Sequence, residues 1–230
     1  TTTAGVNSGG TNSATLNARL ITLTANDQST IYGTALGLGT SAYALSSGSL
    51  GTGDTITGVT LQQSSNSTVP TTQSAGSYSG GVNGILASGA TGSGGFNTTN
   101  YTISYAPGTL TIYKAPLGVS LSGTYSGTTT ITPTSFTLSG LVNGETVTSL
   151  SSATVYNANV SYSNNYVTGI VSGGGTATLS NYAIYSSYSA GLTGSTNSSV
   201  RSGTTTAGVN SGGTNSATLN ARLITLTAND

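Results

Sequence analysis

The sequence predicts an all-β fold in tandem units, and two observations carry this prediction. Short apolar runs alternate with polar residues at a period of two, and turns rich in glycine and asparagine separate them, without any helical period. The first twenty-seven residues, 1–27, also return without a change as 204–230, an offset of 203 residues. An identical copy of this length predicts a tandem array, and we expect the chain to be a window on it that shows one period and an overlap.

The composition narrows the classes of function. Only 3% of the residues are charged, against about 25% in typical soluble domains, and the formal net charge is zero. Nucleic acid and anionic membranes are therefore not expected partners. No run approaches the ~18 apolar residues of a membrane span, so we expect no membrane insertion. Because the chain has no Cys, Met, Trp or His, disulfides and thiolate or imidazole chemistry are excluded, and stability must come from sheets and packing.

The first domain is expected over 18–114. It follows residues 1–17, a Ser-, Thr- and Gly-rich stretch that we interpret as a linker or an edge strand from the repeat junction. The alternation of apolar and polar residues from Arg19 to Ala25 predicts the first strand, and Thr55 to Leu61 predicts another. Residues 62–99 are rich in Ser, Gly and Asn and are predicted to be mostly loop.

A hairpin is expected to close the first domain. Residues 100–105 and 110–114 both alternate, and Ala106-Pro107-Gly108-Thr109 between them has the composition of a turn. Pro116 then removes a backbone donor, and the next strand is predicted to begin at Leu117 without a spacer. A second domain is therefore expected over 115–190.

In the second domain, Asn143-Gly144 predicts a hairpin turn. Further strands are predicted at 155–162, 166–171 and 176–185, with a turn at 173–175. A Ser/Thr/Gly-rich junction is expected at 191–217, followed at 218–230 by the first strand of the next repeat. The alternation also predicts four core residues: Leu110, Ile112, Leu138 and Ile184.

Several motifs resemble repeat domains of large bacterial adhesins. Two motifs, one at each end of the first domain, resemble the MBG domain. They are Leu23-Thr-Ala-Asn-Asp-Gln-Ser-Thr-Ile-Tyr32-Gly33 and Asn100-Tyr101-x-Ile103-x-Tyr105-x-x-Gly108-x-Leu110-x-Ile112-x-Lys114-Ala-Pro-Leu. Three motifs of the second domain are similar to the companion YDG repeat: Gly123-Thr-Tyr125-Ser126-Gly127, Leu138-Ser-Gly-Leu-Val-Asn-Gly-Glu and Asn181-Tyr-x-Ile184. In that second set Ser126 replaces the family's Asp, and the closing strand departs from the pattern because Gly191-Leu192 follows Asn181 at a longer distance.

The resemblance implies a fold and a setting for the chain. It implies tandem immunoglobulin-like β-sandwich domains that serve as stalk modules of a secreted, surface-attached protein. The expected location is therefore extracellular, at the cell surface. It implies no catalytic residues.

The residues themselves predict no catalytic, cofactor-binding or metal site, and we expect no enzyme. Hydroxyl nucleophiles lack a histidine base, and Asp27, Asp54 and Glu145 are far apart in sequence, whereas calcium prefers several carboxylate oxygens in one loop. Lys114, the only lysine, raises the question of an isopeptide bond to an Asn assisted by Glu145; a solvated lysine at a strand end is favoured. The tyrosines at 101, 105, 182 and 185 could line a glycan-binding surface, and core positions are favoured for them.

The predicted function is that of a structural repeat unit of a long adhesin or surface filament. Its expected partners are neighbouring repeats of the same chain or other copies of the protein. In a stalk the tract 191–217 is a flexible linker; in a filament it adds a strand to an adjacent domain, which we favour. The two copies, 1–27 and 204–230, should then occupy equivalent positions in successive units. The alternative function is a module that binds surface glycans or host proteins multivalently.

Overall fold

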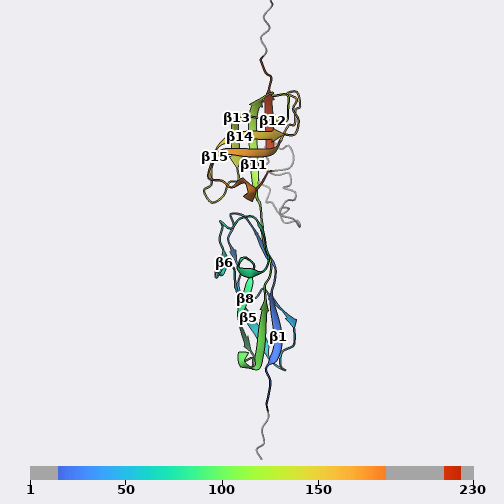
Figure 1. Cartoon of the computed structure of the whole chain (residues 1–230), viewed down its shortest axis with the longest axis vertical. Helices are drawn as coiled ribbons and strands as arrows, with labels where there is room; N and C mark the ends of the chain where they lie inside the picture. Colours follow the sequence, from blue (N-terminus) through green and yellow to red (C-terminus); the bar gives the residue numbers. More distant parts are fainter. Residues whose placement is uncertain (1–14, 185–214, 224–230) are drawn as a thin grey trace, which may run out of the picture.

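The computed structural model describes residues 15–184 and 215–223, and the regular elements of the described chain are almost all β-strands. It forms two lobes that follow one another along the long axis of the molecule (Figure 1). Besides strands, this part of the chain holds three short 3₁₀ turns: η1 (Gly81–Asn83), η2 (Thr98–Asn100) and η3 (Leu179–Asn181). The prediction of an all-β fold is confirmed.

Lobe 1 comprises ten strands between Arg19 and Tyr113. One sheet has the order β4-β1-β9, formed by Tyr43–Ser47, Arg19–Ala25 and Tyr101–Ala106. A second sheet has the order β2-β10-β7, formed by Gln28–Ile31, Leu110–Tyr113 and Gly76–Tyr78. Two strand pairs complete the lobe: β3 (Leu36–Gly37) with β6 (Thr68–Val69), and β5 (Thr55–Gln62) with β8 (Leu86–Ser93).

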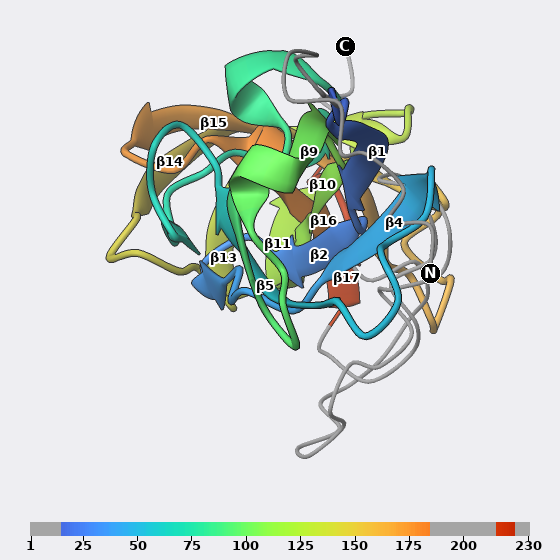
Figure 2. The same ribbon diagram turned by 90° about the horizontal axis from the view of Figure 1, so that it is seen from below.

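Lobe 2 begins at Ala115, and only Lys114 separates it from the end of β10. Its first sheet has the order β13-β11-β16, formed by Pro133–Ser139, Ala115–Thr124 and Tyr182–Ile184, and β17 (Asn215–Asn220) also pairs with β11. Its second sheet has the order β12-β14-β15, formed by Thr130–Ile131, Val147–Val155 and Val167–Gly175. Seen from below in Figure 2, β1 lies beside β9 at the upper right, and β11 lies near the middle of the view, close to β16.

The two lobes share one strand plan. In each, the opening strands pair in parallel with the closing strands: β1 with β9 and β2 with β10 in lobe 1, and β11 with β16 and β17 in lobe 2. Parallel pairing of opening and closing strands sends the chain in at one end of the lobe and out at the other. The lobes are therefore joined in series, with β1 starting at the lower end and β17 ending at the upper end of Figure 1.

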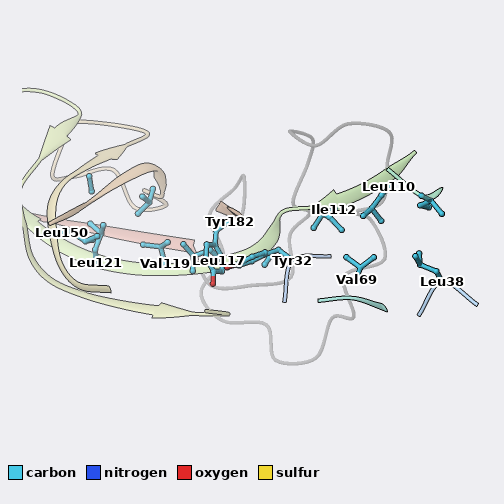
Figure 3. Packing of buried hydrophobic residues seen from close by; sticks show 14 of the residues in the cluster. Tyr32, Leu38, Val69, Leu110, Ile112, Leu117, Val119, Leu121, Leu150 and Tyr182 are labelled. Atoms are coloured by element: carbon cyan, nitrogen blue, oxygen red, sulfur yellow. The ribbon is translucent and has the colours of Figure 1, made fainter. Parts of the chain in front are cut away.

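The core follows the alternation of the strands and continues through both lobes. In β1, Ile21, Leu23 and Ala25 are buried, as their spacing predicts. A row of buried side chains runs from Leu110 and Ile112 in β10 past the join to Leu117, Val119 and Leu121 in β11 (Figure 3). Of the four predicted core residues, Leu110 and Ile112 are buried, while Leu138 and Ile184 are half-buried and pack against the same cluster.

The two predicted hairpins are wrong, because the strands around each turn belong to different sheets. β9 pairs with β1, whereas β10 pairs with β2 and β7, so the corner at Pro107-Gly108 carries the chain from one sheet to the other. Likewise β13 pairs with β11, and β14 pairs with β12 and β15. Asn143 and Gly144 do have the positive φ angles of 55° and 70° that their sequence predicts. The conformation of the Asn143-Gly144 turn is therefore as predicted, whereas the predicted pairing of the strands around it is wrong.

Other predicted boundaries also differ. The stretch 62–99 contains β8, an eight-residue strand whose Ala90 is its only buried side chain, so it lacks an apolar signal. The strand predicted at 155–162 is a loop, because the strand residues lie earlier, in β14. The predicted turn 173–175 belongs to β15, and the last predicted strand is reduced to η3 and β16; its Tyr185 lies outside the described residues.

β17 is the part of the predicted junction that joins lobe 2. Its residues pair with β11 from Val119↔Asn215 to Thr124↔Asn220, so 218–220 complete lobe 2 and do not start the next first strand as expected. The Asn215 side chain is fully buried, accepts from the Val167 N–H (2.8 Å) and donates to its carbonyl (2.9 Å). Burial of such an amide is tolerated because both of its polar atoms are paired.

Within this chain the two copies of the repeated segment have different neighbours, because only the second copy follows a lobe 2. Asn215–Asn220 has the sequence of residues 12–17, so Leu219 corresponds to Leu16. Leu219 is 7% exposed beside β11, whereas Leu16 is 96% exposed. The predicted equivalence of the copies at Ile224 and Leu226 lies outside the described residues. Where both copies are described, the leucine is buried only in the copy that has β11 beside it.

This contrast makes a matched pair of substitutions possible. Leu219→Ala is expected to lower the free energy of unfolding of lobe 2 by about 2–5 kcal/mol, because it removes a buried side chain. Leu16→Ala, the same change in the same sequence, should cost less than about 0.5 kcal/mol because that side chain is exposed. Urea denaturation of the full chain measures both. Equal effects would contradict the docking of β17 on β11.

Candidate functional site

The joint between the two lobes is a polar site built by residues of both lobes. Only Lys114 separates β10 from β11, so the last strand of lobe 1 leads directly into the first strand of lobe 2. Lys114 itself is half-buried, and it lines a small hollow with Tyr182 and Ile184. A one-residue link limits the rotation of one lobe against the other, and side chains on both sides then fix it.

Glu145 receives hydrogen bonds from a tyrosine of each lobe. The Tyr32 hydroxyl, at the end of β2, donates to Glu145 Oε1 at 2.6 Å, and the Tyr182 hydroxyl, at the start of β16, donates to Glu145 Oε2. The two rings meet edge to face, with centroids 5.6 Å apart at an interplanar angle of 84°. Hydrogen bonds to a carboxylate are shorter and stronger than those between neutral groups, so this contact orients the lobes.

The turn before Glu145 is what brings the carboxylate to the joint. Asn143 and Gly144 close it, and the Glu145 N–H donates to the Val142 carbonyl at 2.9 Å. The Val142 N–H in turn donates to the Tyr182 hydroxyl at 3.1 Å, so that this hydroxyl both accepts and donates. The turn, the carboxylate and Tyr182 thus form one connected unit in lobe 2.

Two further contacts cross the joint. Asn143 Nδ2 donates to the Thr71 carbonyl at 3.0 Å, and the Ala75 N–H donates to Asn181 Oδ1 at 2.9 Å. The lobe 1 residues of these contacts, Thr71 and Ala75, lie between β5 and β8, in the stretch that was expected to be mostly loop. Each contact pairs a side chain of lobe 2 with the backbone of lobe 1, which satisfies polar groups that the contact between lobes covers.

Gly33 allows the lobes to approach closely. Its φ is +88°, and a Cβ built on it would lie 2.6 Å from Val142 Cβ, which is shorter than any real carbon contact. Any other residue would be strained by its backbone and would push the lobes apart. The pair Tyr32-Gly33 therefore supplies both the hydroxyl and the space that the joint needs.

Burial raises the pKa of both joint tyrosines, and the hydrogen bond to the Glu145 carboxylate raises it further. A phenolate in this place would lose its bond and face the negative carboxylate, so the protonated form is favoured. The joint is therefore expected to remain intact through neutral pH and to weaken in strong alkali.

The acids that the sequence singled out lie in three separate places. Asp27 accepts from the Thr109 N–H (2.6 Å) and holds the corner of lobe 1, while Asp54 accepts from the Tyr101 hydroxyl (2.5 Å). Within the described ranges, no three His, Cys, Asp or Glu residues gather as a metal-binding group. Sequence reasoning missed the pairing of Tyr32 with Glu145, and the turn formers before Glu145 were the only local signal for it.

The tyrosines considered for a glycan surface divide by position. Tyr101 and Tyr182 are buried, as the core interpretation predicts, and their hydroxyls bind carboxylates. Tyr105 is exposed, and its hydroxyl oxygen accepts from the Ala90 N–H at 2.9 Å. Tyr185 is not among the described residues.

The raised tyrosine pKa values predict a loss of stability in alkali. Above pH of about 10 the unfolded chain releases its tyrosine protons first, so the free energy of unfolding falls as the pH rises; below that pH it is unaffected by these groups. Tyr32→Phe and Tyr182→Phe should each make this fall shallower, because each removes one such proton. Urea denaturation between pH 9 and 11 measures the slopes, and slopes unchanged in both variants would contradict the joint.

Comparison of the sequence with known proteins finds a match to one protein family. No curated protein and no solved structure matches the chain. Among the described residues, no helix has the length and apolar character to cross a membrane. Residues 21–111, which include Tyr32 and Gly33, match the family model of the MBG domain of the YGX type. The predicted resemblance to the MBG domain is thereby confirmed over residues 21–111, a match consistent with the MBG-type repeat domains of bacterial surface proteins.

Proposed function

We propose that the chain is a structural repeat unit of a long extracellular bacterial adhesin or surface filament. In this role it provides extension and mechanical connection for adhesion or biofilm formation. The observation that carries the proposal is β17: in its second copy, the repeated segment that precedes β1 supplies a strand of the second lobe. Successive units are then tied by backbone hydrogen bonds, and each lobe serves as an immunoglobulin-like β-sandwich in the series.

The internal joint supports the same role. A single residue links the lobes, and the contacts of Glu145 with Tyr32 and Tyr182 fix their angle. A fixed angle at each joint carries force along the chain and holds a distant tip away from the surface. The partners in this proposal are neighbouring repeats of the same chain or other copies of it.

The proposed role is non-catalytic. The carboxylates of the described chain are engaged in structure: Asp54 and Glu145 accept from tyrosines, and Asp27 accepts from a backbone N–H. We therefore assign these groups to orientation of loops and lobes.

The ordered strand β17 favours a filament over a flexible stalk. Its side chains Asn215, Ala217 and Leu219 are buried on lobe 2, and the Ala217 N–H donates to the Asn165 carbonyl at 2.9 Å. A free linker would bury none of these groups. Strand addition of this kind gives affinity through the backbone and register through the side chains.

Electron microscopy of the native array tests the proposal. We expect a thin fibre on intact producing cells, labelled by antibodies against the chain, with a regular period on the order of 60–90 Å for two sandwiches in series. Leu219→Asp should abolish the regular angle between units, because it places a charge on the buried side of β17. An intracellular antigen, or angles that vary as widely without the substitution, would contradict the proposal.

Glycan binding is the second candidate, and an exposed aromatic cluster favours it. Tyr156 is 52% exposed, and its ring stacks on that of Tyr166 with centroids 4.7 Å apart. Such rings present an apolar face that a sugar can cover. Retention of the full chain on immobilised polysaccharide, abolished by Tyr156→Ala, would support this candidate. Failure of the unsubstituted chain to be retained would exclude it for the polysaccharide used.

A further inference from the structure

Lobe 2 carries at its far end a tyrosine placed like Tyr32. The Tyr32 N–H donates to the carbonyl of Tyr113, the last residue of β10, at 2.8 Å. The Tyr125 N–H donates to the carbonyl of Asn220, the last residue of β17, at 2.9 Å. Each tyrosine thus follows the opening strands of its lobe and is held against the end of the closing strand. Tyr32 meets lobe 2 there, whereas Tyr125 is 40% exposed.

Lobe 1 carries at its near end a carboxylate placed like Glu145. Asp54 ends the turn between β4 and β5, as Glu145 ends the turn between β13 and β14. The Tyr101 hydroxyl donates to Asp54 Oδ2 and accepts from the Gly51 N–H at 2.7 Å. Tyr182 makes the same two bonds with Glu145 and Val142. The difference lies in the second carboxylate oxygen, because the described residues bring no donor to Asp54 Oδ1.

The chain itself leads from one of these ends to the other. After Asn220 come Ala221 and Arg222, which have the sequence of Ala18 and Arg19. Arg19 Nη1 donates to the Leu50 carbonyl at 2.9 Å, next to the turn that carries Asp54. In a following copy, Arg222 would take the place of Arg19 and would hold this turn two residues beyond the end of β17. Tyr125 is held at that same end of β17.

Two open hollows lie at these ends and share the same linking residues. One, of about 510 Å³, is lined by Tyr125, Ser126 and Val160 together with Ala221 and Arg222. The other, of about 360 Å³, is lined by Gly51, Asp54 and Tyr101 together with Ala18 and Arg19. Because Ala221 and Arg222 are the second copy of Ala18 and Arg19, both hollows border one and the same stretch of an array.

Side-chain volumes at the two ends are complementary. At the internal joint the residue after the tyrosine is Gly33, and the facing turn carries Val142. At the open ends the residue after the tyrosine is Ser126, and the corresponding turn carries Gly51. The larger and smaller residues have exchanged sides, so that a close approach remains sterically allowed.

We propose that the two hollows are the halves of one interface between successive copies, in which the Tyr125 hydroxyl donates a hydrogen bond to the Asp54 carboxylate of the following copy. The occupant of each hollow is thus a second copy of this chain. This inference rests on the proposed function, since it requires copies in series. The joint between units then repeats the joint within a unit, and the whole array has one kind of angle-setting contact.

Distance measurements by electron spin resonance test the proposal. The chain has no cysteine, so introduced pairs can be labelled with nitroxides without background. The protein is the present chain lengthened by one 203-residue period, which keeps all its residues and adds a following copy. One pair, Thr137→Cys in the first unit with Ser88→Cys in the second, spans the joint between units. The same two substitutions within the first unit span the internal joint, and both sites are exposed.

We expect a narrow distance distribution across both joints. Tyr125→Phe in the first unit should roughly double the width across the joint between units and leave the internal joint unchanged, because one charge-assisted bond is lost. Tyr32→Phe in the first unit should widen the distribution across the internal joint and leave the joint between units unchanged. Asp54→Asn in the second unit should reproduce the effect of Tyr125→Phe. The unchanged internal distance also shows that the Tyr125→Phe and Asp54→Asn variants are folded.

Tyr162→Phe is the matched control, because Tyr162 is an exposed tyrosine in the loop after β14 that has no counterpart at the internal joint. It should alter neither width. A narrow distribution that Tyr125→Phe leaves unchanged would overturn the hydrogen bond while the array function stands. A broad distribution across the unsubstituted joint between units would overturn the interface itself. Fibres on the cell surface, seen by microscopy, judge the proposed function independently of both results.

Discussion

The parallel pairing of the opening strands with the closing strands of each lobe is the constraint on which the rest of the molecule depends. In β1 with β9, in β2 with β10, and in β11 with β16 and β17, the chain that leaves a lobe runs in the direction of the chain that entered it. An antiparallel partner would return the chain to its starting end. The parallel partner instead makes every lobe a link with its entrance and exit at opposite ends, so that lobes can be joined by a single residue.

With the links so short, the angle between lobes depends on a few polar contacts. The chain has neither disulfides nor many charges, and one of its few carboxylates, Glu145, is used to bind tyrosines from both lobes. Hydrogen bonds of this kind are directional, whereas apolar contact alone would tolerate a range of angles. The turn geometry at Asn143-Gly144 and the missing Cβ at Gly33 matter because they allow these bonds to form.

The position of β17 shows that the repeated segment belongs to two units. It completes the second lobe and continues at once toward the next first strand. One stretch of chain therefore has to satisfy two neighbours: Asn215 and Leu219 are buried against lobe 2, and Arg19, a few residues further in the same repeated segment, binds the carbonyl of Leu50 in lobe 1. This double demand ties consecutive units together.

The sequence by itself determined what depends on neighbouring residues. Period-two alternation indicated β1, β5, β9, β10 and β11, the dipeptide Asn143-Gly144 indicated its turn, and the motif around Tyr32-Gly33 indicated the family of lobe 1. Only the tertiary structure decided which strands pair, since alternation fixes the buried face of a strand and leaves its partner open. It also decided that Tyr32 reaches Glu145, 113 residues away, and that Leu219 is buried while Leu16, in the same sequence, is exposed. Burial depends on which strand lies beside a residue, so identical leucines differ in exposure when only one of them has β11 beside it.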